Sequence, residues 1–163
     1  MTVTDQFLAN NESYAAGFGK GDLAVPQATQ VAVLACMDSR LDPARALGLE
    51  EGDAHVIRNA GGVVTDDAIR SLAISQTLLG TEEIVLIHHT DCGLLTVTDE
   101  EFAERLELET GSRPGWRAQA FTDLEQSVRD SIARLRESPF VQRDSSVRGF
   151  VYEVETGRLR EVA

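Results

Sequence analysis

Two short segments of the chain carry side chains that could hold a metal ion and do chemistry beside it. In the first, an apolar run ends at Cys36, and Asp38 and Arg40 follow at alternate positions. In the second, His89 and Cys92 form a His-x-x-Cys pair after another apolar run. Two thiolates and one imidazole are ligands that select zinc over magnesium or calcium. These residue types therefore predict a zinc site with a carboxylate and a guanidinium beside it.

The number of candidate ligands indicates a catalytic site rather than a structural one. Structural zinc sites usually fill four positions with protein ligands, whereas catalytic sites leave one position open. Cys36, His89 and Cys92 make three, and the chain has no third cysteine. Asp38 is close enough in sequence to take the fourth position itself, which would block catalysis. Two forms of the site are therefore alternatives: an open form with a free fourth position, and a closed form in which Asp38 occupies it.

The adjacent histidines His88 and His89 compete for the role of ligand. Neighbouring residues of an extended chain point to opposite faces, so we expect only one of them to bind the metal. Spacing alone does not choose between them. The other is expected to be a packed or hydrogen-bonded histidine rather than a proton relay.

Simpler explanations exist for each of these residues taken alone. A cysteine in an apolar run is commonly a buried thiol, and Asp38 with Arg40 could form a plain ion pair. A disulfide between Cys36 and Cys92 is not expected in a reducing compartment. Burial alone does not predict a His-x-x-Cys partner, so the metal site is the better explanation.

The elements around these segments alternate between strands and helices. Continuous apolar runs at 30–36 and 84–87 are typical of strands covered on both faces, and 54–57 and 147–154 also have strand patterns. Helices are predicted over 4–18, after Asp42-Pro43, after Thr65, and over 97–108 and 118–137. This order predicts an α/β fold, a mostly parallel doubly wound sheet flanked by helices. Residues 158–162 are expected to pair back as an antiparallel edge strand.

Such a sheet would bring the two chemical segments together. Ligands of doubly wound sheets bind outside the carboxyl ends of the strands, where the strand order reverses. Cys36 lies at the end of the first core strand, and His89 and Cys92 lie at the end of the third. If these strands are neighbours, they are about 4.8 Å apart, and one metal ion can bridge their ends.

Length and charge limit the organisation and the partners. We expect the 163 residues to form a single domain, 1–163, in which 1–18 is an N-terminal helical arm that could wrap a partner subunit. The formal net charge of −12 gives no positive field for nucleic acid or an anionic membrane, so neither is expected as a partner. No apolar run is long enough to span a membrane, and the first residues do not resemble a signal peptide. We therefore expect a cytoplasmic protein.

The order Cys36-x-Asp38-x-Arg40 and then His89-x-x-Cys92 resembles the β-class carbonic anhydrases. The Arg58-Asn-Ala-Gly-Gly62 turn between them is also similar to that family. The resemblance extends from about residue 30 to the C-terminal strand. It implies an enzyme, a carbonic anhydrase, that reversibly hydrates carbon dioxide to bicarbonate. It also implies one zinc ion per chain and self-association to a homodimer or a multiple of it.

The resemblance assigns roles to six residues. It implies Cys36, His89 and Cys92 as the zinc ligands, and Asp38 and Arg40 as a catalytic dyad that orients a zinc-bound hydroxide. It implies that Gly93 offers its backbone N–H to the substrate.

The chain departs from the family pattern at two positions, and two other functions remain open. The family often has glycine where this chain has His88, and asparagine where it has Gly62; both departures concern substrate contacts rather than the zinc site. Related proteins with the same ligand set hydrolyse carbonyl sulfide or carbon disulfide. A non-catalytic zinc module with a structural or sensing role is the third possibility.

Overall fold

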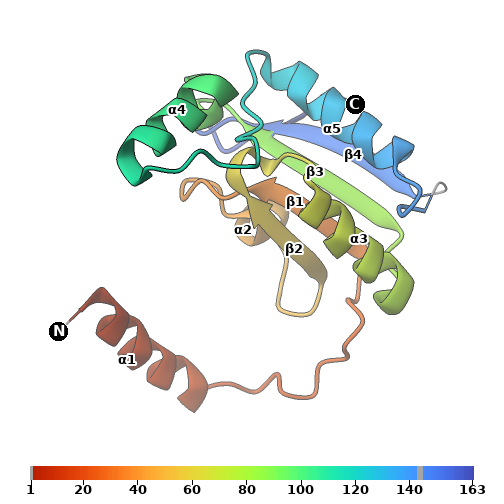
Figure 1. Ribbon diagram of the computed structural model, residues 1–163. Coiled ribbons are helices and arrows are strands. Elements are labelled where there is room, and N and C mark those ends of the chain that lie inside the picture. Colours follow the sequence, from red (N-terminus) through yellow and green to blue (C-terminus); the bar gives the residue numbers. More distant parts are fainter. Residues whose placement is uncertain (1, 143–144) are drawn as a thin grey trace.

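The computed structural model describes residues 2–142 and 145–163. It contains a five-stranded sheet in the order β2-β1-β3-β4-β5 (Figure 1). The strands are β1 (Val31–Cys36), β2 (Ala54–Asn59), β3 (Glu83–His89), β4 (Ser146–Tyr152) and β5 (Leu159–Glu161). All neighbouring pairs are parallel except β4 and β5, which are antiparallel. The predicted mostly parallel sheet with an antiparallel edge is confirmed.

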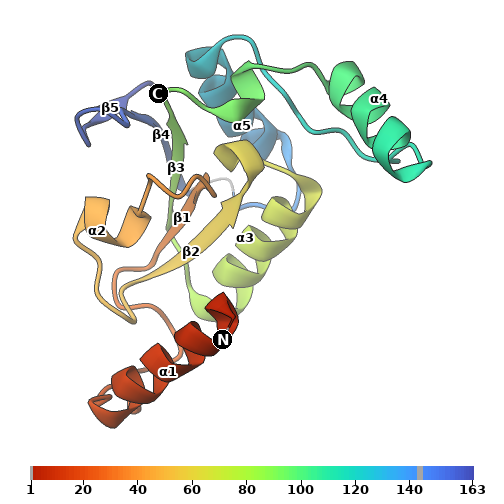
Figure 2. The ribbon, with the colours of Figure 1, turned by 90° about the vertical axis from the view of Figure 1, so that its left-hand side faces the viewer.

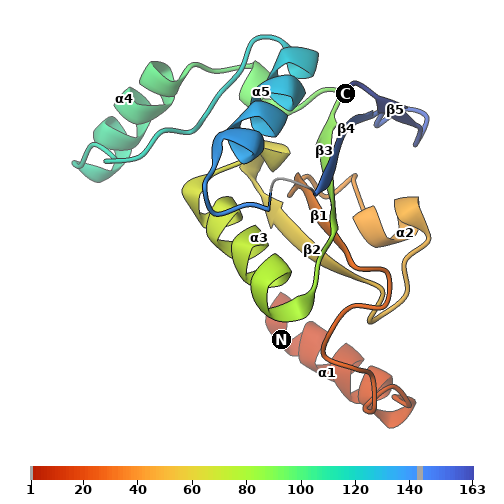
Figure 3. The ribbon, with the colours of Figure 1, turned by 90° about the vertical axis from the view of Figure 1, so that its right-hand side faces the viewer.

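Helices cover both faces of this sheet. The helices of the described chain are α1 (Val3–Ala16), α2 (Pro43–Leu47), α3 (Asp66–Leu79), α4 (Asp99–Thr110) and α5 (Leu124–Glu137), with short 3₁₀ turns η1 (Ala60–Gly62) and η2 (Gly93–Leu95). The sheet is covered by α2, α3 and α5. Figures 2 and 3 show α2 on one face and α3 with α5 on the other. This two-sided cover is the doubly wound arrangement that the sequence predicts.

The central strand β1 explains why its sequence is an unbroken apolar run. Ala32 and Leu34 pack into the core on the side of α3 and α5, whereas Val33 and Ala35 pack with Leu41 on the opposite side. Because both faces of the strand are covered, alternate residues cannot be polar. The strand end at Cys36 is therefore buried as well.

Most helices begin directly after their predicted capping residues, but the predicted start of the helix over 118–137 is wrong. The Thr65 side chain accepts a hydrogen bond from Ala68 N and caps α3 as expected. Helix α5 begins only at Leu124, because Asp123 is its N-cap, so residues 118–123 are not helical. Instead, the Asp99 carboxylate accepts a hydrogen bond from Ala120 N at 2.9 Å and fixes this segment against α4.

Helix α1 is formed as predicted and lies away from the sheet (Figure 1). None of its residues is buried, and a hydrogen bond of 2.7 Å from Tyr14 Oη to the Glu51 carboxylate links it to the body. Within the part of the chain that the structure describes, no helix has both the length and the apolar character needed to cross a membrane.

Candidate metal centre

The pairing of β1 with β3 brings the two chemical segments to one edge of the sheet. Ala35 pairs with Ile87, so Cys36 and His89 both lie where their parallel strands end. Cys92 follows β3 after a short turn. The ligand atoms of Cys36, His89 and Cys92 all lie within 4.8 Å of one another, and the three residues are buried. The predicted adjacency of these strands is confirmed, while the role of the three residues as ligands stays a prediction.

The hydrogen bonding of His89 leaves one nitrogen free for a metal. Its Nδ1 lies 2.8 Å from the carbonyl oxygen of Thr90, which can only accept, so Nδ1 carries the proton. In the neutral ring, Nε2 then carries a lone pair. This atom is buried and has no hydrogen-bond partner among the described residues. An unpaired buried lone pair beside two sulfurs fits a zinc ion.

His88 points to the other side of the strand and has a full set of partners. Its Nε2 donates to the Gly62 carbonyl at 3.1 Å, and its Nδ1 accepts from Ser127 Oγ at 3.3 Å. Its ring stacks on Phe121 with the centroids 5.8 Å apart. Burial lowers the pKa of His88 to about 4, so the ring is neutral near pH 7. These contacts support the packed role that was expected for one of the two histidines.

The two cysteines are free, and their sulfurs lie within 4.8 Å of each other, which favours deprotonation of one of them. The contact with Cys92 lowers the pKa of Cys36 to about 4 despite burial, and the same contact raises the pKa of Cys92. Burial lowers the pKa of His89, but its contacts with Cys36 and the Thr90 carbonyl outweigh this and raise it overall. Cys36 is therefore readily deprotonated, as a metal ligand must be.

Asp38 is held by Arg40 beside the three candidate ligands. Arg40 Nε donates to Asp38 Oδ1 at 3.0 Å, and Nη2 donates to Oδ2 at 2.8 Å, which is a bidentate ion pair. The side-chain and backbone hydrogen bonds from Arg40 hold the pKa of the Asp38 carboxyl well below its usual range. Asp38 Oδ2 also lies 3.7 Å from His89 Nε2. The carboxylate thus borders the candidate metal centre while it is paired with Arg40.

Arg58 fixes the loop that carries Cys36 and Asp38, a role that the sequence did not suggest. Its Nε and Nη2 donate to the Cys36 carbonyl at 3.0 and 2.8 Å. Its Nη2 also contacts the carbonyl oxygens of Asp38 and Leu41, each at 2.7 Å. Because the acceptors are backbone groups, which every residue has, no sequence pattern marks this interaction.

The turn after β2 passes directly beside the end of β1. A Cβ atom on Gly62 would lie 2.7 Å from the Ile87 carbonyl oxygen and 2.8 Å from the Cys36 nitrogen, and its φ is +68°. Both the conformation and the space therefore require glycine. The turn therefore makes its close approach to the backbone of Cys36 and Ile87.

Gly93, the predicted substrate contact, lies at the start of η2 directly after Cys92. It is exposed, and a Cβ atom there would meet nothing within 4 Å. The space beside its backbone is therefore open to a small molecule. Its contact with substrate stays a prediction.

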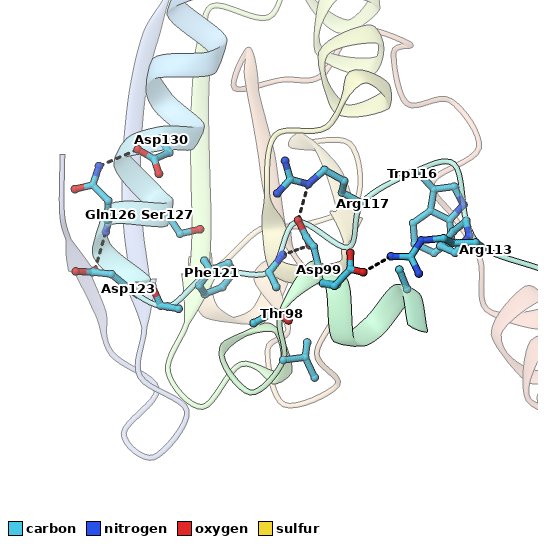
Figure 4. A pocket seen from close by; sticks show the side chains of 16 residues that line it. Thr98, Asp99, Arg113, Trp116, Arg117, Phe121, Asp123, Gln126, Ser127 and Asp130 are labelled. Atoms are coloured by element: carbon cyan, nitrogen blue, oxygen red, sulfur yellow. Dashed lines mark hydrogen bonds and ion pairs between the residues drawn. The ribbon is translucent and has the colours of Figure 1, made fainter. Parts of the chain in front are cut away.

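A cavity of about 800 Å³ lies beside this edge, between α4, the segment after it and α5 (Figure 4). None of the three candidate ligands lines it. Both arginines of its lining pair with acidic side chains, Arg117 with Asp99 at 2.7 Å and Arg113 with Glu100 at 2.6 Å. The candidate metal centre at the strand ends is therefore separate from the lining of this cavity.

The fold and the site together define a class, an α/β protein with a candidate catalytic metal centre at the carboxyl edge of a parallel sheet. The sequence profile of the family described as carbonic anhydrase matches residues 31–111. The chain is 58% identical over 162 residues to β-carbonic anhydrase 1 of Mycobacterium tuberculosis, covering 99% of each sequence. The chain belongs to the β-carbonic anhydrase family and is an enzyme of that class, which confirms the resemblance seen in its motifs.

Two further comparisons agree with this assignment. The crystal structure of carbonic anhydrase from Streptococcus mutans superimposes with a TM-score of 0.95 at 49% identity, covering 100% of this chain and 99% of that one. A carbon disulfide hydrolase of Acidianus is 37% identical over 182 residues, covering 96% of this chain and 87% of the relative. The second relative shows that a different activity is found within the same wider group.

Proposed function

We propose that this enzyme reversibly hydrates carbon dioxide to bicarbonate and a proton, with one zinc ion per chain held by Cys36, His89 and Cys92. The observation that carries the proposal is the buried His89 Nε2, which has no hydrogen-bond partner in the described chain and lies within 4.8 Å of both sulfurs. Bound zinc supplies a Lewis acid that lowers the pKa of water, as it does in carbonic anhydrases generally.

In this proposal, Asp38 and Arg40 orient the reacting water. The Asp38 carboxylate, kept ionised by Arg40, accepts a hydrogen bond from the reacting water and directs the oxygen lone pair at carbon dioxide. Arg40 holds both oxygens of the carboxylate in place through its bidentate ion pair. The backbone N–H of Gly93, an exposed residue, donates to an oxygen of the substrate.

The zinc site is tested by a matched pair of histidine substitutions. His89→Asn should weaken zinc binding by at least about a hundred-fold and abolish hydration, because it removes a direct ligand. His55→Asn is the control, because His55 lies on β2 and bonds Ser75 at 2.7 Å, outside the cluster. The measurements are metal content by mass spectrometry and stopped-flow carbon dioxide hydration. Full zinc occupancy in the His89 variant would contradict the ligand assignment.

Hydrolysis of carbon disulfide or carbonyl sulfide is the second candidate activity. It is supported by the carbon disulfide hydrolase of Acidianus at 37% identity, against 58% for the carbonic anhydrase of M. tuberculosis. We expect carbon dioxide to be the preferred substrate. Comparing kcat/KM for carbon dioxide and carbonyl sulfide on the same zinc-loaded preparation decides between them.

We further propose that the chain is a single domain whose residues 1–18 form an arm that packs on a second copy, giving a homodimer or a multiple of it. Large apolar side chains on and just after α1 are exposed to solvent: Val3, Phe7, Leu8, Tyr14 and Phe18. An isolated helix of this length is marginal in water, so a partner surface is needed to stabilise it. A second copy of the chain supplies such a surface.

We also propose that the enzyme works in the cytoplasm without a nucleic-acid or membrane partner. Both cysteines are free thiols, which persist in reducing compartments. The net charge of −12 opposes binding to nucleic acid and to anionic lipid. Cell fractionation with an antibody against the enzyme tests this location.

A further inference from the structure

The guanidinium of Arg40 makes hydrogen bonds along two of its edges, one to Asp38 and the other to Asp91. The edge formed by Nε and Nη2 carries the bidentate pair with the Asp38 carboxylate. The edge formed by Nη1 and Nη2 faces Asp91, where Nη1 donates to Asp91 Oδ2 at 2.6 Å and Nη2 donates to the Asp91 carbonyl oxygen at 3.0 Å. Two planar contacts on adjacent edges fix the orientation of a guanidinium more tightly than one.

Asp91 reaches Arg40 through an uncommon backbone conformation. Its φ is +56°, in the left-handed region that residues other than glycine adopt infrequently and that aspartate and asparagine tolerate best. It lies in the short turn between His89 and Cys92. The turn therefore connects the segment with two candidate ligands to the guanidinium that holds Asp38.

The exposure of this pair argues for a geometric role rather than a stabilising one. The side chain of Asp91 is 74% exposed and that of Arg40 is 45% exposed. Ion pairs this exposed add little to the free energy of folding. The same contacts still restrict the rotation of Arg40, and Asp38 Oδ2 lies only 3.7 Å from His89 Nε2, so a loosened carboxylate has the metal centre as a competing partner.

We propose that Asp91 is a positioning residue, which fixes the plane of Arg40 so that Asp38 stays paired with Arg40 and directed at the reacting water. The proposal rests on the carbon dioxide hydration proposed above. Asp91 itself touches neither the substrate nor the metal and acts only through Arg40.

The test compares two Asp→Asn variants. Asp91→Asn keeps an oxygen acceptor and a residue that tolerates positive φ, but it removes the charge. Asp66→Asn is the matched control, because Asp66 at the start of α3 also pairs with an arginine, Arg134, at 2.6 Å, and that pair includes neither Arg40 nor Asp38. Both variants should keep full zinc content and the wild-type unfolding midpoint.

The first readout needs no metal. In ¹⁵N-labelled metal-free protein, hydrogen exchange at Arg40 Nε should become about five-fold faster in Asp91→Asn and remain unchanged in Asp66→Asn, in line with the loss of one exposed ion pair. The Arg40 signal is identified by its absence from Arg40→Lys. Unchanged exchange in Asp91→Asn would overturn the proposal.

The second readout is a double-mutant cycle with Arg40→Ala. Asp91→Asn should lower kcat/KM for carbon dioxide by about five-fold in the wild-type background and cause no further loss in the Arg40→Ala background. An equal loss in both backgrounds, or a loss of zinc, would show that Asp91 acts through the metal-binding turn and would overturn the proposal.

The two proposals fail in different ways. If the wild-type enzyme loaded with zinc hydrates no carbon dioxide, the proposed function is wrong, and the exchange rate at Arg40 still decides the role of Asp91. If the wild type is active and both readouts are the same in Asp91→Asn as in Asp66→Asn, only the positioning role is wrong.

Discussion

At the scale of single residues, the sequence predicts the reactive groups better than their supports. Cys36, His89 and Cys92 stand out by residue type and spacing, and their ligand atoms lie within 4.8 Å of one another. The choice between the two histidines was not available from spacing. It depends on the carbonyl groups that each ring meets, that of Thr90 for His89 and that of Gly62 for His88.

Arg58 and Asp91 were missed for a common physical reason. Each makes a hydrogen bond to which a backbone carbonyl contributes. The Arg58 side chain donates to the Asp38 carbonyl, and the Asp91 carbonyl accepts from Arg40. Backbone groups are the same at every position, so only the folded path of the chain reveals which carbonyl meets which side chain. Charged residues beside a predicted metal site are the one signal that could have drawn attention to Asp91.

Asp38 gives the residue-scale prediction. Asp38→Asn keeps the shape of the side chain and removes its charge, so carbon dioxide hydration should fall by about a hundred-fold or more while zinc is retained. Asp67→Asn, in an exposed pair with Arg70 at 2.8 Å, is the control and should be fully active. Stopped-flow hydration and metal analysis measure both. A gain of activity in Asp38→Asn would instead show that Asp38 normally blocks the site.

At the scale of elements, apolar runs and capping residues predict most of the fold. The runs at 30–36 and 84–87 became the adjacent central strands β1 and β3, and Asp42 and Thr65 cap α2 and α3. The start of α5 was placed six residues too early, since 118–123 lie outside the helix and Asp123 caps it. The contact of Asp99 with Ala120 that holds this segment is long-range, so local patterns do not reveal it.

A pair of glycines provides the element-scale prediction. Gly62 and Gly48 have similar φ values of +68° and +70°, but only Gly62 is crowded, since a Cβ on Gly48 would meet nothing within 4 Å. Gly48→Ala should cost about 1–2 kcal/mol in unfolding free energy from its conformation alone. Gly62→Ala should cost about 1–3 kcal/mol more, because the Cβ displaces the backbone of Cys36 and Ile87.

Urea unfolding of the metal-free variants measures both costs, and zinc titration completes the test. Gly62→Ala should also bind zinc more weakly than Gly48→Ala, because the end of β1 is displaced. Equal unfolding free energies for the two variants would show that the turn adjusts without moving Cys36.

At the scale of the whole molecule, the strand order determines which strand ends lie together at the candidate site. It does not determine what the exposed helix α1 packs against. The strand order β2-β1-β3 puts β1 between its two parallel neighbours, and the rule that ligands bind at the carboxyl edge then locates the site from sequence. Helix α1 has no buried residue, so it does not pack against the sheet of its own chain. Sequence patterns predict such a helix but not what it packs against.

Phe7 gives the whole-molecule prediction. Phe7→Asp should weaken self-association by about ten-fold or more, because it places a charge among the apolar side chains that we propose to contact the second copy. Ala9→Asp is the control, because residue 9 is rotated by about 200° from residue 7 on a helix and faces away. Sedimentation equilibrium over a range of concentrations measures both. Identical masses for Phe7→Asp and wild type at every concentration would refute the role of the arm.

In the proposed zinc site, the position of Cys36 and His89 on neighbouring strands would tie metal loading to the folding equilibrium. The three donor groups converge only while β1 and β3 are paired, so the unfolded chain offers no comparable site, and the binding energy is added to the stability of the native state. Zinc bound there would thus join parts of the chain that are distant in sequence. A chelator should therefore lower the free energy of unfolding of the zinc-loaded protein to that of the metal-free protein.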